Sequence, residues 1–447
     1  MFNIESLVEI NLKFDSEETI HTVGLFHRYA SQDKGNNNKM YNKMKIGLIK
    51  ETKIPEDNRV ALSPEQVAKL NQEFPDSEIV VQSSEIRAFT DKEYRDAGVK
   101  VVGDMSDCDV LFGIKEAQID SLIPNKHYFF FAHIAKMQEY NRPLLQAMLA
   151  KNLTFSDYEY LVDENGERVC AFGWWAGVVG VYYTLRGYGV KIGRNSLPKP
   201  DRKFTLAQMR RVLAIAQLPK VKILITGNGR VAQGATYVMR ECRAQELTLD
   251  QFLSDAPVNT LSFYRASVNE LVKRKDGKPF DRSDFRKDPE AYESDFIKFA
   301  KHTDIFIPCH FWDPKAPVYL EQEDFQKYNL PIKMIGDITC DICGGIKSTI
   351  RPATHAEPYY DFNPVTFKEE LPFSSQDNIT VMAVDTCPNA LAIDASEYFG
   401  DMLTEYVFRP LLRGEGDTSE VINKSTIVRK GKLTDRFTYL EDFAKKE

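Results

Sequence analysis

The chain has 447 residues, too many for one hydrophobic core of ordinary size, so we expect two or three domains. Hydrophobic residues make up 43% and charged residues 28%, and the mean hydropathy is -0.38, a composition typical of a soluble globular protein. A formal net charge of -7 argues against a nucleic-acid partner held on a basic surface.

Seven cysteines are scattered without a short-spaced framework, which is typical of a protein in a reducing compartment. A lone CxxC, from Cys340 to Cys343, has no second pair to complete a zinc site, so we expect no metal. The apolar run 171–183 is too short to span a bilayer, and the N-terminus lacks the basic start and apolar core of a signal peptide. We therefore expect a cytoplasmic protein without a membrane partner.

Residues 1–43 are polar and end in a linker-like run, so we treat them as an N-terminal extension without an assigned function. After them, short apolar runs alternate with helical segments. A first helix is capped by Ser63 and opens with Pro64, and further helices are expected at 91–98 and 141–150. Strands are predicted at 45–50, 78–82, 99–102, 109–115, 128–133 and 153–158.

The second half repeats this alternation. Helices are expected at 172–185, 206–215 and 231–239, and strands at 221–225, 258–263, 304–309, 334–338 and, last in the chain, 379–384. The pattern predicts an α/β fold with two Rossmann-like domains whose parallel sheets flank a cleft. A helical block at 395–412 is expected to pack back on the first domain. The first domain would then be discontinuous, 44–160 with 388–447, around a dinucleotide-binding domain at 161–387.

A strand, a glycine turn and a helix follow one another from Val221 to Ala235. Gly227 and Gly229 would let the backbone approach a pyrophosphate, which the N–H groups of the first helical turn would face. Ala232 stands at the third glycine position of the motif, and Gly234 is expected to provide close helix–strand contact. The alternative is an ordinary tight turn. The small residues on one face of the helix 172–185 predict close packing against another element.

Polar side chains stand at or near the ends of several predicted strands. Lys115 and His133 each follow an apolar run, and Glu159 stands at the exit of the next strand. Ligands gather at the C-terminal ends of strands in open α/β sheets, although a solvated lysine and a core histidine are the ordinary alternatives. Arg59 could hold a carboxylate through two hydrogen bonds, or pair with Asp57 or its neighbour Glu56.

Several motifs together resemble the alanine dehydrogenase and transhydrogenase superfamily: EDNRVALSPEQV, DVLFGIKE, YFFFAHIAK and GNGRVAQGA. Longer segments, among them DYEYLVDENGERVCAFGWWAGVVG, GDITCDICGGI and VMAVDTCPNALAIDASEYFGDML, are similar to lysine-2-oxoglutarate reductase and lysine-forming saccharopine dehydrogenase domains. The resemblance runs from about Met44 to the C-terminus. In some relatives a second, glutamate-forming dehydrogenase follows, and because this chain ends where the first domain does, we expect it to catalyse one step.

The resemblance implies a pyridine-nucleotide enzyme with its site in the cleft. Lys115 and His133 would be the acid–base pair, and Arg59 would hold a substrate carboxylate. Glu116 and Glu159 would line the pocket and tune the pair. Because Glu116 follows Lys115 directly, we expect Lys115 to be stabilised as the cation.

The cofactor is expected to be NAD or NADP. The resemblance implies that the pyrophosphate is bound by Gly227, Gly229, Arg230, Val231 and Ala232, and that Asp341 lies near the nicotinamide ribose. An acid that binds the ribose 2′-OH is expected at the end of the second nucleotide strand. That strand, LSFYRAS, ends instead with Arg265 and Ser267, which suit a 2′-phosphate, whereas Glu246 and Asp250 are the candidate acids if the strand is misplaced. The choice between the two cofactors stays open.

The function implied is that of an oxidoreductase acting on a secondary amine. It would condense lysine with 2-oxoglutarate and reduce the product to saccharopine, or run the reverse reaction. One alternative is an alanine dehydrogenase-type enzyme that uses pyruvate and ammonia. Another is a non-catalytic nucleotide-binding subunit, against which the joint presence of Arg59, Lys115 and His133 counts. The sequence leaves the direction and the oligomeric state open.

Overall fold

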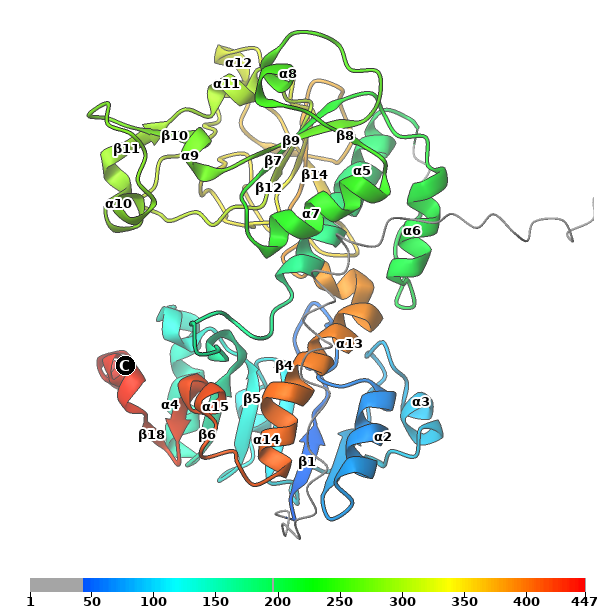
Figure 1. Ribbon diagram of the computed structural model, residues 1–447, viewed down its shortest axis with the longest axis vertical. Coiled ribbons are helices and arrows are strands. Elements are labelled where there is room, and N and C mark those ends of the chain that lie inside the picture. The colour runs from blue at the N-terminus through cyan, green and yellow to red at the C-terminus, as the bar shows by residue number, and fades with distance from the viewer. Residues whose placement is uncertain (1–42, 195–196, 447) are drawn as a thin grey trace, which may run out of the picture. The chain divides into compact units, whose positions relative to one another are not determined.

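The computed structural model describes residues 43–194 and 197–446 (Figure 1). These residues form two eight-stranded sheets covered by helices, and one separate two-stranded sheet. Two largely parallel sheets in an α/β arrangement confirm the predicted fold class. The predicted N-terminal extension, residues 1–43, lies outside the described residues except for Lys43.

The first sheet has the strand order β18-β17-β6-β5-β4-β1-β2-β3. Its strands are β1 (Lys45–Leu48), β2 (Glu78–Gln82), β3 (Val101–Val102), β4 (Val110–Lys115), β5 (His127–Phe131), β6 (Thr154–Asp157), β17 (Thr426–Arg429) and β18 (Lys432–Leu433). The strands β1 to β6 are parallel, and β17 and β18 join antiparallel at the β6 edge. The prediction that 379–384 is the last strand is therefore wrong. Lys430 and Gly431 both have positive φ, which suits a tight hairpin turn between the two strands that sequence reasoning missed.

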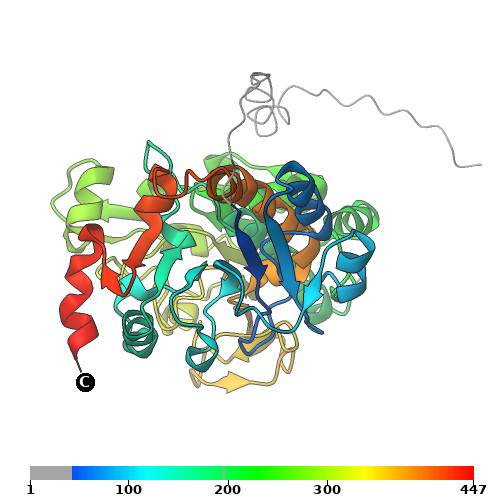
Figure 2. The same cartoon turned by 90° about the horizontal axis from the view of Figure 1, so that it is seen from below.

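Helices from both ends of the chain pack on this sheet. They are α2 (Pro64–Glu73), α3 (Asp91–Asp96), α4 (Arg142–Ala150), α13 (Ala392–Leu403), α14 (Arg409–Leu412), α15 (Glu420–Ser425) and α16 (Glu441–Lys445), with a π-helical turn (Thr404–Phe408) between α13 and α14. Ser63 caps α2 as predicted. The amide of Gln66 donates to the carbonyl of Glu397 at 2.8 Å, so α13 packs on α2 and the expected return of 395–412 is confirmed (Figure 1). The last helix, α16, lies against α4 (Figure 2).

The second sheet has the order β15-β14-β16-β13-β12-β7-β9-β8. Its strands are β7 (Lys222–Thr226), β8 (Gln245–Glu246), β9 (Ser262–Ala266), β12 (Ile305–Pro308), β13 (Met334–Gly336), β14 (Tyr359–Phe362), β15 (Glu369–Glu370) and β16 (Ile379–Met382), and β10 (Val272–Arg274) pairs with β11 (Tyr292–Ser294) apart from it. Only β14 runs against the other strands of this sheet, so its pairings with β16 and β15 are the antiparallel ones. The strand predicted at 258–263 begins later, because pairing with β7 sets its register from Ser262.

The described residues from Gly173 to Lys327 form eight α-helices. They are α5 (Gly173–Lys191), α6 (Leu206–Ile215), α7 (Arg230–Glu241), α8 (Leu249–Leu253), α9 (Val268–Leu271), α10 (Arg282–Lys287), α11 (Ile297–Ala300) and α12 (Asp324–Lys327). The helix α5 continues beyond the predicted end at 185. A Cβ on Gly187 would come within 2.6 Å of the Tyr359 ring, so this glycine serves close packing and does not end the helix. None of the helices in the described ranges is both long and apolar enough to cross a membrane.

The helices α5 and α7 cross at a point where neither has a side chain. A Cβ on Gly177 would lie 1.9 Å from the carbonyl oxygen of Val231, and one on Gly234 would lie 2.0 Å from that of Trp174. The close packing predicted for the small-residue face of α5 is thus confirmed. The predicted helix–strand role of Gly234 is wrong, because its close neighbour is a helix. Backbone contact at this crossing fixes the start of α7 against α5.

The structure places these sheets as the sequence expects, but the exact domain boundaries stay predictions. The strands of the first sheet come from 45–157 and 426–433, and those of the second sheet come from 222–382. We propose the division into 44–160 with 388–447 and 161–387 on this basis.

Candidate active site

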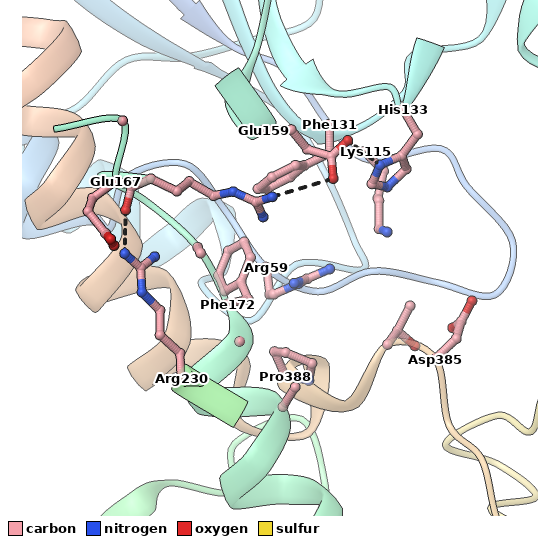
Figure 3. Close-up of a pocket in the computed structure, with 16 residues that line it drawn as sticks. Arg59, Lys115, Phe131, His133, Glu159, Glu167, Phe172, Arg230, Asp385 and Pro388 are labelled. Atoms are coloured by element: carbon pink, nitrogen blue, oxygen red, sulfur yellow. Dashed lines mark hydrogen bonds and ion pairs between the residues drawn. The ribbon is translucent and has the colours of Figure 1, made fainter. Parts of the chain in front are cut away.

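A cavity of about 530 Å³ is lined by residues from the part of the chain that forms the first sheet and by residues from the part that forms the second sheet (Figure 3). Five of the predicted site residues line it: Arg59, Lys115, His133, Glu159 and Arg230. The other lining residues with ionisable side chains are Glu167, Arg168 and Asp385. The remaining predicted site residues, Glu116, Gly227, Gly229, Val231, Ala232, Arg265 and Asp341, do not line this cavity.

Lys115 is the last residue of β4, and its side chain points into the cavity (Figure 3). Burial, and then the positive charges of Arg59 and Lys53, lower the pKa of the Lys115 ammonium below its ordinary value. Glu116 forms an ion pair with Lys53 at 2.7 Å instead. The expectation that Glu116 stabilises Lys115 as the cation is therefore wrong, because desolvation and neighbouring cations outweigh one carboxylate that is already paired. No described residue forms an ion pair with the Lys115 ammonium.

His133 lies two residues beyond β5 and has a φ of 55°. The predicted strand 128–133 ends early because the buried Asp157 carboxylate accepts hydrogen bonds from the N–H groups of Ala132 and His133, both at 3.2 Å. Burial raises the pKa of Asp157 to about 6. The backbone is thereby turned so that the imidazole lines the cavity. Its Nδ1 lies 2.9 Å from the Glu159 carboxylate.

Glu159 lies on a short 3₁₀ turn (Tyr158–Tyr160) after β6, and several cationic side chains surround its carboxylate. Its carboxylate lies 3.3 Å from the Lys136 ammonium and 3.8 Å from the Arg168 guanidinium. Burial raises the pKa of Glu159, but the hydrogen bond and charge of His133, followed by the charges of Lys136 and Arg168, lower it to about 2. Glu159 is therefore ionised at neutral pH and orients the cationic side chains around it.

Sequence reasoning missed Lys136 and Arg168. Lys136 lies on a 3₁₀ turn (Ile134–Lys136), and Arg168 lies in a loop, so neither position has a periodicity that marks it. Both are recognised only because their charges converge on Glu159. Arg168 also lines the cavity, where a guanidinium is free to bind a carboxylate.

Arg59 is nearly fully buried, with 4% of its side chain exposed. Its Nε and Nη2 donate to the two carboxylate oxygens of Asp57 at 2.9 and 2.5 Å, which is one of the two arrangements expected from the sequence. The guanidinium carbon lies 4.3 Å from the centre of the Phe172 ring. Because Asp57 occupies only one edge and Arg59 lines the cavity, the Nη1 edge is available to a ligand.

Asn389, near the start of the segment that returns to the first sheet, holds the loop that carries Arg59. Its Oδ1 accepts from the N–H of Asn58 at 2.7 Å, and its Nδ2 donates to the carbonyl of Glu56 at 3.0 Å. The loop is thus tied on both sides of Asp57, which limits the movement of the Arg59–Asp57 pair.

The glycine turn fits a dinucleotide pyrophosphate. Gly227 has a φ of 102°, and a Cβ there would lie 2.9 Å from the carbonyl oxygen of Cys309, so only glycine suits this position. Gly229 is the N-cap of α7, and the first backbone bond of that helix runs from Gln233 N to Gly229 O at 3.0 Å. The preceding N–H groups therefore have no partner within the helix and can bind phosphate oxygens. Arg230 follows, and its Nη2 donates to the carbonyl of Arg168 at 2.5 Å.

Arg265 lies on β9, the strand next to β7, opposite Ile225. No described residue forms a hydrogen bond or ion pair with its side chain. The strand carrying Glu246, β8, pairs with β9 and not with β7, so Glu246 is not at the expected ribose position. Asp341 follows β13 outside the cavity wall, and burial, with the nearby Asp337, raises its pKa.

Residues 47–179 match the family model of the alanine dehydrogenase/PNT N-terminal domain. Two solved structures share the two-sheet fold. One is an L-alanine dehydrogenase, with a TM-score of 0.61 and 17% identity over 90% of this chain and 99% of that one. The other is a transhydrogenase from Sinorhizobium meliloti, with a TM-score of 0.56 and 16% identity over 87% of this chain and 100% of that one.

The more similar curated relatives confirm the resemblance found in the motifs. An alpha-aminoadipic semialdehyde synthase of Arabidopsis thaliana is 29% identical over 88% of this chain and 41% of the relative. A mitochondrial protein of the same name from Mus musculus is 28% identical over 90% of this chain and 48% of the relative. A saccharopine dehydrogenase [NAD(+), L-lysine-forming] of Neurospora crassa is 27% identical over 79% of this chain and 88% of that relative. The chain thus spans about half the length, or less, of the first two.

Proposed function

We propose that the protein is an NAD(P)-dependent oxidoreductase that interconverts saccharopine with lysine and 2-oxoglutarate. The observation that carries the proposal is the cavity, in which Lys115 and His133 stand together with the guanidinium groups of Arg59, Arg168 and Arg230. Saccharopine carries three carboxylates, and several guanidinium groups around one acid–base pair suit such a ligand. The similarity to relatives named for saccharopine dehydrogenase supports the same substrate class.

Arg59 and Arg168 are the groups that we expect to bind the carboxylates of 2-oxoglutarate. Arg59 is held by Asp57 and has one free edge, so it can bind a carboxylate without losing its orientation. Arg168 faces the same cavity and shares Glu159 with His133. The exposed carboxylate of Asp385 also lines the cavity and suits the ammonium group of lysine.

Lys115 and His133 are the groups that we expect to move protons. Forming the carbinolamine from the ε-amine and the ketone, and losing water from it, each need a proton to be moved at nitrogen or oxygen. The lowered pKa of Lys115 brings its neutral form closer to physiological pH, so it can accept a proton as well as donate one. His133 is held through its Nδ1, which lies 2.9 Å from the Glu159 carboxylate and 3.2 Å from the Lys136 ammonium, so Nε2 is the nitrogen that we expect to face the substrate.

The bound dinucleotide would supply or accept the hydride. The turn from Gly227 to Ala232 would hold its pyrophosphate, and Asp341 is expected near the nicotinamide ribose. We propose NADP as the preferred form, because no residue in the described ranges pairs with the Arg265 side chain at the ribose end of β9. The nearby Glu270 already accepts hydrogen bonds from the Tyr264 hydroxyl and from Ser267, so its carboxylate is held by its own segment of the chain.

Four assays test the function. NAD(P)H absorbance is followed with lysine plus 2-oxoglutarate and then with pyruvate plus ammonia, each with NADH and with NADPH. We expect oxidation of NADPH only in the first mixture. Turnover of pyruvate and ammonia would support the alanine dehydrogenase alternative instead. Silence in all four mixtures, with intact NADPH binding, would favour a non-catalytic nucleotide-binding subunit.

Replacing Arg265 by alanine should weaken NADPH binding by about 10- to 150-fold, because a charged hydrogen bond to a phosphate contributes on the order of 1.5–3 kcal/mol. The dissociation constant for NADH should stay within about twofold of wild type. Both constants are measured by titrating nucleotide fluorescence. Arg211→Ala is the matched control, since Arg211 is an exposed arginine on α6. Equal weakening of both nucleotides would contradict the proposed 2′-phosphate contact.

A further inference from the structure

The strand that ends at Lys115 is not regular. In the pairing of β4 with β5, Phe112 stands opposite Phe129 and Lys115 stands opposite Phe131. Gly113 and Ile114 therefore face the single residue between those partners, which defines a β-bulge in β4. Bulges bend a strand and redirect the side chains that follow, and they are rare in parallel pairs. This bulge immediately precedes the side chain that enters the cavity.

The carboxyl group of Glu51, whose pKa is raised to about 8 by burial and by the charge of Asp57, binds the bulged segment from the β1 side. Glu51 Oε1 accepts a hydrogen bond from the N–H of Ile114 at 2.6 Å, and Oε2 accepts one from the N–H of Lys115 at 2.9 Å. In a regular strand two successive N–H groups point to opposite sides, so their convergence on one side chain is a consequence of the bulge. The backbone of β1 no longer reaches them, because its last bond to β4 runs from Ile49 N to Phe112 O at 2.9 Å.

A second side chain binds the same segment from the other side. The hydroxyl of the fully buried Tyr158 donates to the carbonyl of Gly113 at 2.9 Å. A Cβ on Gly113 would lie 3.2 Å from the Ile49 side chain and 3.3 Å from Glu51 Oε1, so the segment has little room to shift. Beyond the end of β1, three hydrogen bonds made by the side chains of Glu51 and Tyr158 thus take the place of backbone pairing between β1 and β4.

We infer that Glu51 is a positioning residue, which fixes the bulge of β4 and thereby aims the Lys115 side chain into the cavity. The inference rests on the proposed function for the role of Lys115, but the local geometry stands without it. Glu51 itself does not line the cavity. It acts through the two backbone N–H groups that define the direction of the Cα–Cβ bond of Lys115.

The test compares the wild-type chain of 447 residues with its Glu51→Gln variant. The glutamine keeps the size of the side chain but presents an amide NH₂ to one of the two backbone donors. We expect amide hydrogen exchange of the peptide containing Ile114 and Lys115 to become faster by about tenfold or more. We also expect kcat to fall by roughly 10- to 100-fold with both substrate KM values within about twofold, because a misplaced acid–base group affects turnover more than binding.

Glu78→Gln is the matched control. Glu78 is a glutamate of the same sheet, at the opposite end of the strands, where its carboxylate pairs with Lys45 at 3.5 Å. It should change neither the exchange of the Lys115 peptide nor kcat. Tyr158→Phe is a second variant that removes only the hydroxyl, and it should also speed exchange in the Lys115 peptide.

Unchanged exchange and kcat in a folded Glu51→Gln variant would overturn the inference. If that variant does not fold, unchanged exchange in Tyr158→Phe would overturn it equally. The exchange measurement does not depend on the substrate. An inactive wild type would therefore refute the proposed function alone, while faster exchange in Glu51→Gln would still support the positioning role.

Discussion

Lys115→Met should lower kcat by about 10³-fold, the range of rate loss when a general acid–base group is removed. Methionine keeps the unbranched apolar stem but has no ionisable group, so the packing at the end of β4 is preserved. The dissociation constant for NADPH should stay within about twofold, because Lys115 lies in the wall formed by the first sheet. Steady-state turnover and fluorescence titration of NADPH measure the two quantities separately.

His133→Gln is the companion variant, and we expect a similar loss of kcat with unchanged nucleotide binding. The variants should also differ from wild type in the pH dependence of kcat/KM. Burial and neighbouring cations lower the pKa of Lys115. The limb of the kcat/KM–pH profile that reports its titration should therefore lie at a lower pH than the pKa of an ordinary lysine. That limb should be absent in Lys115→Met. Near-normal turnover in both variants would refute the acid–base assignment.

Gly177→Ala should destabilise the protein by about 3 kcal/mol or more, the upper range for forced overpacking. The new methyl carbon would lie 1.9 Å from a carbonyl oxygen of α7, and backbone cannot give way as a flexible side chain can. Chemical denaturation measures the loss. Because the crossing fixes the start of α7, NADPH binding should weaken as well.

Gly173→Ala is the control for this variant, since Gly173 lies on the same helix. Its Cβ would meet nothing closer than Val231 Cγ2 at 3.5 Å, an ordinary contact. Its stability should stay within about 1 kcal/mol of wild type, the scale of helix propensity alone. A Gly177→Ala protein as stable as this control would show that the helices can separate at little cost.

The sequence predicted the elements whose signals are local. The strand 78–82, the helix 206–215 and the Ser63 cap lie where the apolar spacing and capping residues put them. The glycine turn was recognised because its steric demands fall on glycine itself. The grouping of Lys115 and His133 in one cavity was expected from their positions at strand ends together with the resemblance to a known family.

Features decided by distant partners could not be predicted in this way. The helix α5 runs through Gly187 because a tyrosine more than a hundred residues later packs on it. Lys115 has a lowered pKa because Arg59 and Lys53 are folded beside it, whereas its sequence neighbour Glu116 is paired elsewhere. The contacts of Glu51 with β4 depend on a register shift between two strands, which leaves no trace in spacing.

The first sheet draws the two strands of one edge, β17 and β18, from residues 426–433, and this has a consequence for synthesis. The hydroxyls of Ser156 on β6 and Thr426 on β17 are hydrogen-bonded across a separation of 270 residues. At a ribosomal rate of about 5–20 residues per second, the outer edge of β6 stays unpaired for on the order of tens of seconds before β17 has been synthesised. Throughout that interval the nascent chain exposes an unpaired strand edge, the kind of surface that recruits chaperones or neighbouring chains.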